Sequence, residues 1–469
     1  MVKCLHYGAR HTEFGVTERR VGARLEPACR LPGNCRFQSL LTFYRQVSQR
    51  STGTHVTNRS TRTNRGAASS QTAREINRDI ILNTVHLHQP VSRADLARLT
   101  GLQASTTSVI IGQLIEEGWV SPGILGHLPR GRRPTFVTLN DKHVSLAVDL
   151  RPEKATVGAV DINGKILSQT IVEFSSHIIT KSEARKAIAK IVNIAQMLRV
   201  QFKGRVLEGV GVSVSGRVDQ EAHRLIFSPN APWSDMDLCN DLRKLLNTPI
   251  EMENAANASL FAERWFGKLG GVSNIVVVSV SEGIGTGILL DGRLVRGRES
   301  LAGEFGHMPF ESTGPLCGCG NVGCWEVFAS NRAALRYYKE TVPDSELTSF
   351  RDLLDLAKSG DIRALRSIDR MASYLARGLA ILAAGLAPEV IVIVGDCTAL
   401  WPRICPIIES ELIARSFTSR IPRVAPATDG DSARLLGAAA LISYKALFRH
   451  TSFEQLHRVK LDRLGKHAS

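Results

Sequence analysis

The sequence has no apolar stretch long enough to cross a lipid bilayer, although 43% of its 469 residues are hydrophobic. It also lacks the apolar core of a secretory signal, because Val2–Arg10 mixes polar and apolar residues. These two absences predict a soluble protein that has no membrane partner. The length is sufficient for roughly two to four domains with sizeable cores.

A disulfide framework is also missing. Six of the nine cysteines are scattered along the chain, at positions 4, 29, 35, 239, 397 and 405. Such irregular spacing is typical of a protein that folds in a reducing compartment. We therefore expect a cytoplasmic protein with free thiols.

Acidic residues are too few to balance the basic ones, and the net charge is +15. The excess is concentrated near the N-terminus, where residues 1–70 contain twelve Lys and Arg against three Asp and Glu. A basic region of this kind predicts a polyanion as partner.

The two ends of the chain are expected to lie outside the folded body. Residues 1–73 form a basic extension that is predicted to be disordered, because Ser, Thr, Asn, Arg and Gly dominate from Gln49 to Ser70. A start codon assigned too far upstream explains the same segment equally well. The tail, residues 446–469, is also basic, and we expect a short helix with a frayed end there.

Cysteine is dense in one place only, where His307 is followed by three cysteines within eighteen residues. The set is His307, Cys317, Cys319 and Cys324. One imidazole and three thiols match a closed, four-coordinate structural zinc site with no position left for catalytic water. Glycines between the cysteines allow the tight turns that such convergence needs. The alternatives are a reduced cysteine cluster and, with less support, a disulfide pair.

Residues 74–140 have the pattern of a winged helix-turn-helix. An apolar helical face runs to His88 and ends at Gln89-Pro90. A second helix opens with the capping box Ser92–Asp95, and a third is predicted from Ala104 to Glu117, after the turn at Gly101. Two strands then flank a cationic segment, Arg130–Pro134, as the two sides of a wing.

The third helix begins with small hydrogen-bonding side chains, as a recognition helix does where it meets bases and phosphates. The cationic wing tip suits the DNA backbone or a minor groove. The residues expected to contact DNA are Ser92, Gln103, Ser105, Thr106, Thr107, Ser108, Arg130, Arg132 and Arg133. In the second helix Leu99, and in the third Val109, are predicted to face inward. The alternative is a winged helix that binds another protein.

From Val144 onward, strands alternate with helices, which predicts an α/β body over residues 144–445. Several of its motifs resemble the ROK family of repressors, open reading frames and sugar kinases. They are Gly-Arg-Arg-Pro at 131–134, Pro229–Trp233, Glu253–Asn257, Leu301–His307, the cysteine loop and Leu435–Ala440. The resemblance covers about residues 74 to 445, and the motifs occur in the family's order. It implies a two-lobed fold of the actin/hexokinase (ribonuclease H-like) type with a sugar in the cleft.

The resemblance also implies a sugar site, made of Asn230, Asn254, Glu304, His307 and Glu326. Carboxylates and amides can each bind neighbouring hydroxyls, and such groups discriminate well in a dry cleft. His307 is expected to bind zinc through one ring nitrogen and a hydroxyl through the other. The alternatives are that Glu304 is a solvated loop acid and that Glu326 only stabilises the start of a helix.

Where kinases of the family have a catalytic Asp, this chain has Ala255. A positioned general base contributes roughly 10²- to 10⁴-fold in rate. The first phosphate loop is replaced by Asp149–Glu153, in which Pro152 has no amide hydrogen to donate. Glu282 and Asp396 place carboxylates in two further phosphate-binding elements. The catalytic machinery of a kinase is therefore predicted to be absent.

These features together predict a sugar-responsive transcriptional regulator of the repressor type. It would bind operator DNA as a homodimer, because paired recognition helices read a near-palindromic site. A sugar effector would shift the population away from the DNA-competent form. The alternatives are a ROK sugar kinase with a DNA-binding appendage, and a degenerate member that acts through protein contacts.

Overall fold

The computed structural model describes residues 70–125, 135–152, 154–174, 180–219, 224–228, 238–267, 269, 271–416 and 420–448. All of these residues fall within one compact unit. The predicted disorder of residues 1–69 and the predicted helix of the tail beyond residue 448 lie outside the described ranges. None of the helices in the described ranges is both long and apolar enough to pass through a bilayer.

The first described segment consists of three helices and a small antiparallel sheet. The helices are α2 (Ser70–His88), α3 (Arg93–Thr100) and α4 (Ala104–Glu116). The strands are β1 (Val91–Ser92), β2 (Val120–Leu125) and β3 (Thr135–Leu139), in the order β1-β3-β2. Helix α2 therefore begins four residues before Arg74. Gly101 ends α3 in the left-handed conformation, with φ of 68°, as expected for the turn between the second and third helices.

The buried face of α4 differs from the predicted one. Thr107, Ile110, Ile111 and Leu114 are buried, at the i, i+3, i+4, i+7 spacing of one helical face. The prediction that Val109 faces inward is wrong, because its side chain is 61% exposed. The same prediction is wrong for Leu99 in α3, which is 46% exposed.

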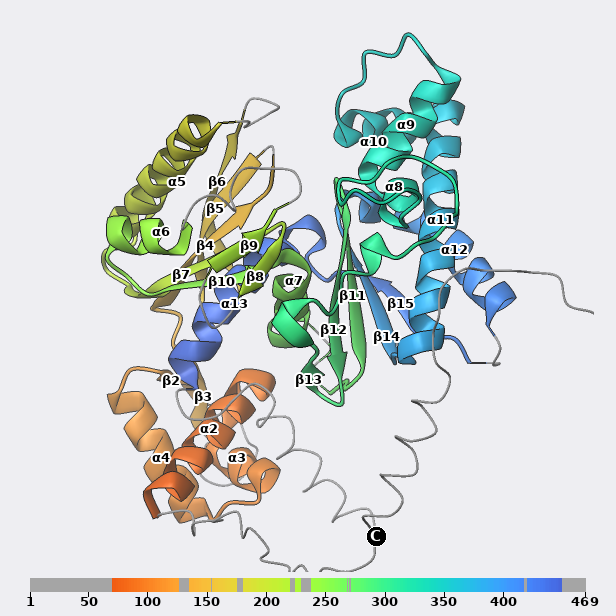
Figure 1. Ribbon diagram of the computed structural model, residues 1–469. Helices are drawn as coiled ribbons and strands as arrows, with labels where there is room; N and C mark the ends of the chain where they lie inside the picture. The colour runs from red at the N-terminus through yellow and green to blue at the C-terminus, as the bar shows by residue number, and fades with distance from the viewer. Residues whose placement is uncertain are drawn as a thin grey trace, which may run out of the picture. The chain divides into compact units, whose positions relative to one another are not determined.

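The body contains two sheets with their helices (Figure 1). The first half comprises β4 (His143–Leu150), β5 (Lys154–Asp161), β6 (Ile166–Glu173), α5 (Lys181–Gln201), β7 (Val206–Val214), β8 (Arg217–Asp219), β9 (Arg224–Phe227), α6 (Leu238–Leu246), β10 (Ile250–Asn254) and α7 (Ala255–Trp265). The second half comprises β11 (Ile275–Val280), β12 (Ile284–Leu290), β13 (Arg293–Leu294), α8 (Glu326–Ala329), α9 (Asn331–Thr341), α10 (Phe350–Lys358), α11 (Ile362–Leu386), β14 (Val390–Val394), α12 (Trp401–Arg415), β15 (Arg423–Pro426) and α13 (Ala433–Leu447). Short 3₁₀ turns occupy Arg298–Ser300, Phe305–His307, Asp396–Leu400 and Gly430–Ser432.

The two sheets have the same topology. Strand order is β6-β5-β4-β7-β10 in one and β13-β12-β11-β14-β15 in the other. In each, three antiparallel strands come first in the chain and two parallel strands are then added beside the first of them. The body is therefore an internally duplicated α/β structure, as the two-lobed prediction requires.

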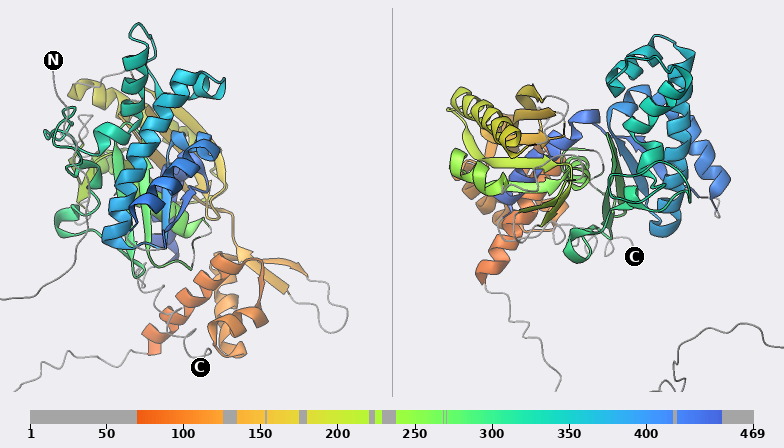
Figure 2. Two further views of the ribbon diagram at one scale, coloured as in Figure 1. Left: turned by 90° about the vertical axis from the view of Figure 1, so that its right-hand side faces the viewer. Right: turned by 45° about the horizontal axis from the view of Figure 1, so that its top comes forward.

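Helices α7 and α13 lie between the two sheets, as both figures show (Figures 1 and 2). Both are rich in Ala and are buried on nearly every side, which is typical of helices inside a large core. A Cβ at Gly437 of α13 would lie 1.8 Å from the carbonyl oxygen of Ala258 in α7. Glycine is thus required at this position for the two helices to pack so closely.

The far ends of α7 and α13 share a hydrophobic core with the first three helices. The ring of Trp265, the last residue of α7, stacks on His86 of α2 with centroids 3.9 Å apart. A second stack joins Trp119, after α4, to His143 at the start of β4, with centroids 4.1 Å apart. His143 also bridges Glu208, at 2.6 Å, and the carbonyl oxygen of Gly118, at 3.0 Å. The N-terminal helices are therefore packed on the body and not merely tethered to it.

Candidate functional site

A cavity lies between the elements of the two halves of the body. It measures about 930 Å³ with its open mouth included, which is within the usual range for a small-molecule site. Its wall comes from the hairpin β8–β9, the start of α7, the β11–β12 turn, the segment before His307 and the start of α8. Four residues of the predicted sugar site line it, namely Asn254, Glu304, His307 and Glu326. The fifth, Asn230, lies outside the described residues.

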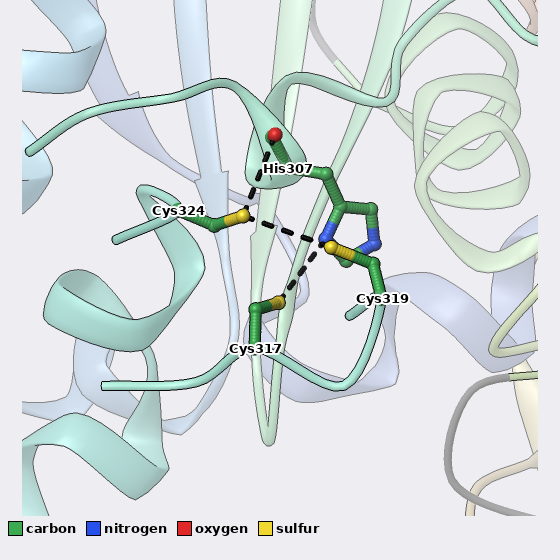
Figure 3. A group of neighbouring side chains, drawn as sticks. All are labelled: His307, Cys317, Cys319 and Cys324. Atoms are coloured by element: carbon green, nitrogen blue, oxygen red, sulfur yellow. Dashed lines mark hydrogen bonds between the residues drawn. The ribbon is translucent and has the colours of Figure 1, made fainter. Parts of the chain in front are cut away.

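The predicted metal ligands converge beside this cavity (Figure 3). The ligand atoms of His307, Cys317, Cys319 and Cys324 all lie within 4.8 Å of one another. The Sγ atoms of Cys319 and Cys324 are 3.7 Å apart, and Sγ of Cys317 is 3.5 Å from Nδ1 of His307. A disulfide between Cys319 and Cys324 is excluded here, because that bond would bring the two sulfurs to about 2.05 Å.

These distances fit a zinc ion. Bonds of about 2.3 Å to sulfur and 2.0 Å to nitrogen give a tetrahedron with edges of about 3.8 Å between sulfurs and 3.5 Å between sulfur and nitrogen. Gly320 and Gly323 hold positive φ angles of 94° and 73°, which turn the backbone around the ligand atoms. Burial raises the pKa of the thiols of Cys317 and Cys324, so a bound cation is needed to keep them as thiolates.

The metal cluster and the cavity share His307. Its Nδ1 faces the sulfur of Cys317, whereas Nε2 lies 3.9 Å from Oε2 of Glu304 on the cavity side. Partial burial raises the pKa of Glu304, whose side chain is 42% exposed at the cavity wall. Oε2 of Glu326 accepts a hydrogen bond of 3.0 Å from the amide of Ile284. Both carboxylates therefore face the space where a ligand would lie.

The β10–α7 junction positions Asn254 and Ala255. Glu253, only 1% exposed, accepts a hydrogen bond from the amide of Asn254 and pairs with Arg296 at 2.7 Å. The side chain of Asn254 caps α7 through the amide of Ala256 and donates to the carbonyl oxygen of Gly216. Ala255, at the predicted position of the kinase base, offers the cavity only a methyl group.

A buried ion network surrounds Asp149, the first residue of the segment that was predicted to replace a kinase phosphate loop. Asp149, 2% exposed, lies 2.8 Å from Nε of Arg151 and 2.8 Å from Nε of Arg434. Arg151 also pairs with Asp431 at 2.6 Å. The carboxylate of Asp149 thus lies within ion-pair distance of two guanidinium groups and is hydrogen-bonded to that of Arg151. Pro152 lies at the cavity wall.

The predicted DNA-contacting residues divide into three groups. Gln103 and Ser105 are exposed at the start of α4, and Thr106 and Ser108 are half-buried there. Thr107 is 0% exposed, so the prediction that it contacts DNA is wrong; the helix is rotated so that Thr107 packs inward.

The prediction that Ser92 contacts DNA is also wrong, because Ser92 is only 5% exposed. Its hydroxyl instead caps α3 by accepting a hydrogen bond of 3.1 Å from the amide of Asp95. The third group, Arg130, Arg132 and Arg133, lies outside the described residues.

Arg217, Phe227 and Arg434 are among the residues of the cavity wall that sequence reasoning missed. Arg217 directly follows Ser215-Gly216 at the end of β7. A charged residue three positions after a buried parallel strand was the available signal, since ligands bind at the carboxyl ends of such strands.

Comparison with known proteins gives relatives of two kinds. The xylose repressor of Bacillus subtilis (strain 168) is 30% identical over 374 residues, which cover 79% of this chain and 95% of the repressor. The glucokinase of Thermotoga maritima is 31% identical over 317 residues, which cover 63% of this chain and 96% of the glucokinase. The repressor alignment therefore extends over a larger share of this chain than the kinase alignment does.

Among solved structures, a ROK family transcriptional regulator, described as a homologue of the E. coli MLC protein, matches with a TM-score of 0.66. It is 23% identical and the match covers 83% of this chain and 99% of the regulator, which supports the fold. The model of the ROK family matches residues 145–445. The duplicated α/β body and the residues that line its cleft lie within that match, and the chain belongs to the ROK family.

Proposed function

We propose that this protein is a sugar-responsive transcriptional regulator that acts as a repressor. The observation that carries the proposal is the contrast within one cavity. The groups suited to sugar hydroxyls, Glu304, His307 and Glu326, face the open space. The position of the kinase base is a methyl group, and Asp149 is engaged by Arg151 and Arg434. This cavity is equipped to bind a sugar and not to phosphorylate it.

The residues of the cavity have separate roles in this proposal. Glu304 and Glu326 accept hydrogen bonds from sugar hydroxyls, and Nε2 of His307 adds a further polar contact. Bound at the cysteine cluster, zinc would fix the ring orientation of His307 and hold the segment that bears Glu326. Asn254 caps α7 with its side-chain oxygen and donates one N–H to the carbonyl oxygen of Gly216. Its second N–H is the donor that serves the ligand.

The N-terminal helices and sheet are proposed to form a winged helix-turn-helix that binds operator DNA. Exposed Gln103 and Ser105, at the start of α4, suit base edges and phosphates. Arg132 and Arg133, between β2 and β3 in the sequence, supply charge for the DNA backbone. A homodimer would present two such helices to a near-palindromic site.

The test uses the purified full-length protein and a duplex enriched by this protein from a random DNA pool. A sugar effector at a hundred times its dissociation constant should stabilise the protein by about 2.7 kcal/mol. The same sugar should weaken binding to the duplex, measured by fluorescence anisotropy. A panel of sugars that changes neither melting nor DNA affinity would contradict the proposal.

The DNA contact has its own prediction. Replacing Arg132 and Arg133 together by Ala should weaken operator binding and reduce the slope of log affinity against log salt by about 2. The matched control replaces Arg363 and Arg366, both exposed on α11, by Ala. It removes the same charge far from the wing in sequence, and should leave the slope unchanged. An equal effect of both pairs would mean that the wing does not touch DNA.

A sugar kinase is the second candidate, because the Thermotoga maritima glucokinase is 31% identical. We expect no ADP release from magnesium ATP with hexoses or amino sugars, either by the wild type or by Ala255→Asp. Restoring the base cannot free Asp149 from its two arginines, and Pro152 still lacks an amide hydrogen. A coupled ADP assay measures this, and thermal shifts confirm that the variant still binds sugar. Clear turnover by Ala255→Asp would favour the kinase.

A further inference from the structure

The two-stranded hairpin β8–β9 brings a cation and an aromatic ring to the cavity. Arg217 in β8 lies directly opposite Phe227 in β9 in the strand register, and both side chains line the cavity. Cross-strand neighbours of this kind lie on one face of a hairpin, about 5 Å apart at Cβ. The sub-site formed by Arg217 and Phe227 is outside the set of residues that the sugar-site motifs identify.

The hairpin is held firmly at its base. Gly216, with φ of 148°, approaches β9 so closely that a Cβ would lie 2.3 Å from the carbonyl oxygen of Phe227. The hydroxyl of Ser228 donates to the carbonyl oxygen of Ser215 at 2.9 Å, and the side chain of Asn254 donates to that of Gly216 at 2.6 Å. Arg217 therefore starts from a fixed backbone, which reduces the entropy lost when it binds a ligand.

Arg217 interacts electrostatically with Glu304 across the cavity but contacts no described acceptor directly. Among the described residues it makes no hydrogen bond or ion pair, and its Nε atom is buried without an acceptor. The other arginine in the cavity wall, Arg434, lies 2.8 Å from Asp149 and is neutralised by it. Leaving a buried donor atom without an acceptor costs free energy. Among the described residues, none supplies an acceptor to the Nε atom of Arg217, so that atom is available to a ligand.

Phe227 defines the neighbouring space. Its side chain is 44% exposed although it lines the cavity. An aromatic face in a binding cleft packs well against the apolar C–H face of a sugar ring. A ring lying on Phe227 would bring its substituents next to the guanidinium of Arg217.

We infer that the effector is an anionic sugar, whose carboxylate or phosphate pairs with Arg217 while its ring packs on Phe227. The inference rests on the proposed function and names the class of ligand. The charges of the cavity also orient such a ligand. Arg217 belongs to the half of the body that contains β4–β10, and Glu304 and Glu326 belong to the other half. The anionic group is attracted to Arg217 and repelled by the two acids, which are left to accept hydrogen bonds from hydroxyls.

The test measures binding by calorimetry with matched sugars. For glucose, galactose, mannose and xylose, the neutral sugar is compared with its sugar acid and its terminal phosphate. We expect the tightest ligand to be charged, to bind at least about tenfold more tightly than its neutral parent, and to weaken as salt rises. The sugar acid and phosphate arms distinguish the two sources of negative charge. A neutral sugar as the tightest ligand overturns the inference and leaves the proposed function standing, whereas no binding by any sugar contradicts both.

Substitutions make the assignment specific to Arg217. Arg217→Gln should reduce affinity for the charged ligand roughly 10- to 100-fold and change the affinity for its neutral parent less than about threefold. Arg217→Lys should retain part of the preference, because it keeps the charge but not the planar fork. The matched control is Arg224→Gln, since Arg224 is exposed on β9 of the same hairpin and does not line the cavity. Equal losses for charged and neutral sugars in Arg217→Gln would mean that Arg217 does not bind the anion.

Discussion

Cys324→Ser is expected to lose the proposed zinc ion and most of the proposed response to sugar. Cys324 is 0% exposed, and its sulfur lies 3.7 Å from that of Cys319. Serine cannot supply a thiolate, so the four-ligand shell becomes incomplete. A metal ion held at a thousand times its dissociation constant stabilises the folded state by about 4 kcal/mol. We expect the free energy of unfolding of the variant to fall by at least this much. Metal analysis and thermal melting measure the two effects.

The sugar response is expected to fall because the metal ligands and the sugar-binding groups share a short segment of chain. His307 faces the cluster with Nδ1 and the cavity with Nε2, and Glu326 follows Cys324 by two residues. Without its anchor, the segment loses the geometry that makes its acceptors converge. Sugar affinity should drop more than tenfold, roughly the effect of losing one charge-assisted hydrogen bond.

The matched control is Cys405→Ser, because Cys405 lies in α12 and takes no part in the cluster. It should keep its zinc, its melting temperature within a few degrees and its sugar affinity. A wild-type protein stripped of zinc by a chelator should behave like Cys324→Ser. If the stripped protein binds sugar as tightly as before, the cluster does not position the sugar site.

The metal ligands could be identified from the sequence because they are local. A motif of four metal-binding side chains within eighteen residues, separated by glycines, can be recognised without knowing the rest of the fold. The ends of α4 were predictable for the same reason, since periodicity and flanking residues define them. The face of α4 was not, because burial depends on where the rest of the core lies. Thr107 and Val109 exchange their predicted environments through a rotation that the sequence of the helix does not encode.

The contacts in the cleft could not be predicted from local sequence either, because they join residues that are far apart in the chain. Asp149 is engaged by Arg434, which is 285 residues later in the chain, and this contact follows only from the fold. Arg217 and Phe227 meet because β8 and β9 pair outside both main sheets. The family motifs named two acids, Glu304 and Glu326, that the structure places in the cavity wall. Residues outside those motifs, Arg217 among them, became candidates only when the cavity wall was known.

The second large effect is expected at Trp265, where α7 meets the N-terminal helices. α7 begins at the cavity, with Asn254 as its cap, and ends with Trp265 stacked on His86. The ring of His86 donates from Nε2 to the carbonyl oxygen of Trp265 at 2.8 Å, and burial lowers the pKa of His86 to about 4. The stack is therefore made by two neutral rings at neutral pH. α7 thus forms a continuous, buried connection between the proposed sugar site and the proposed DNA reader.

Trp265→Ala should lose about 3–5 kcal/mol of stability, the usual cost of removing a large core aromatic, and should separate sugar binding from DNA binding. Coupling free energies between sites are typically 1–3 kcal/mol, or about 5- to 150-fold in affinity. We expect the ratio of operator dissociation constants with and without sugar to fall below about threefold in the variant, whereas sugar affinity itself changes little.

His86→Ala is the gentler variant, because it removes the stack and leaves Trp265 in contact with Tyr444 and Phe448. His86→Ala should also reduce the ratio of operator dissociation constants with and without sugar. This variant provides the test if Trp265→Ala proves too unstable to purify. Trp401→Ala is the control, since Trp401 packs in the core of the second half of the body, away from the N-terminal helices. A conformational change reaches DNA only through contacts that differ between the two states. If both His86→Ala and Trp401→Ala retain the full ratio, α7 does not transmit the sugar signal, and the second stack, between Trp119 and His143, becomes the remaining route from the body to the proposed reader.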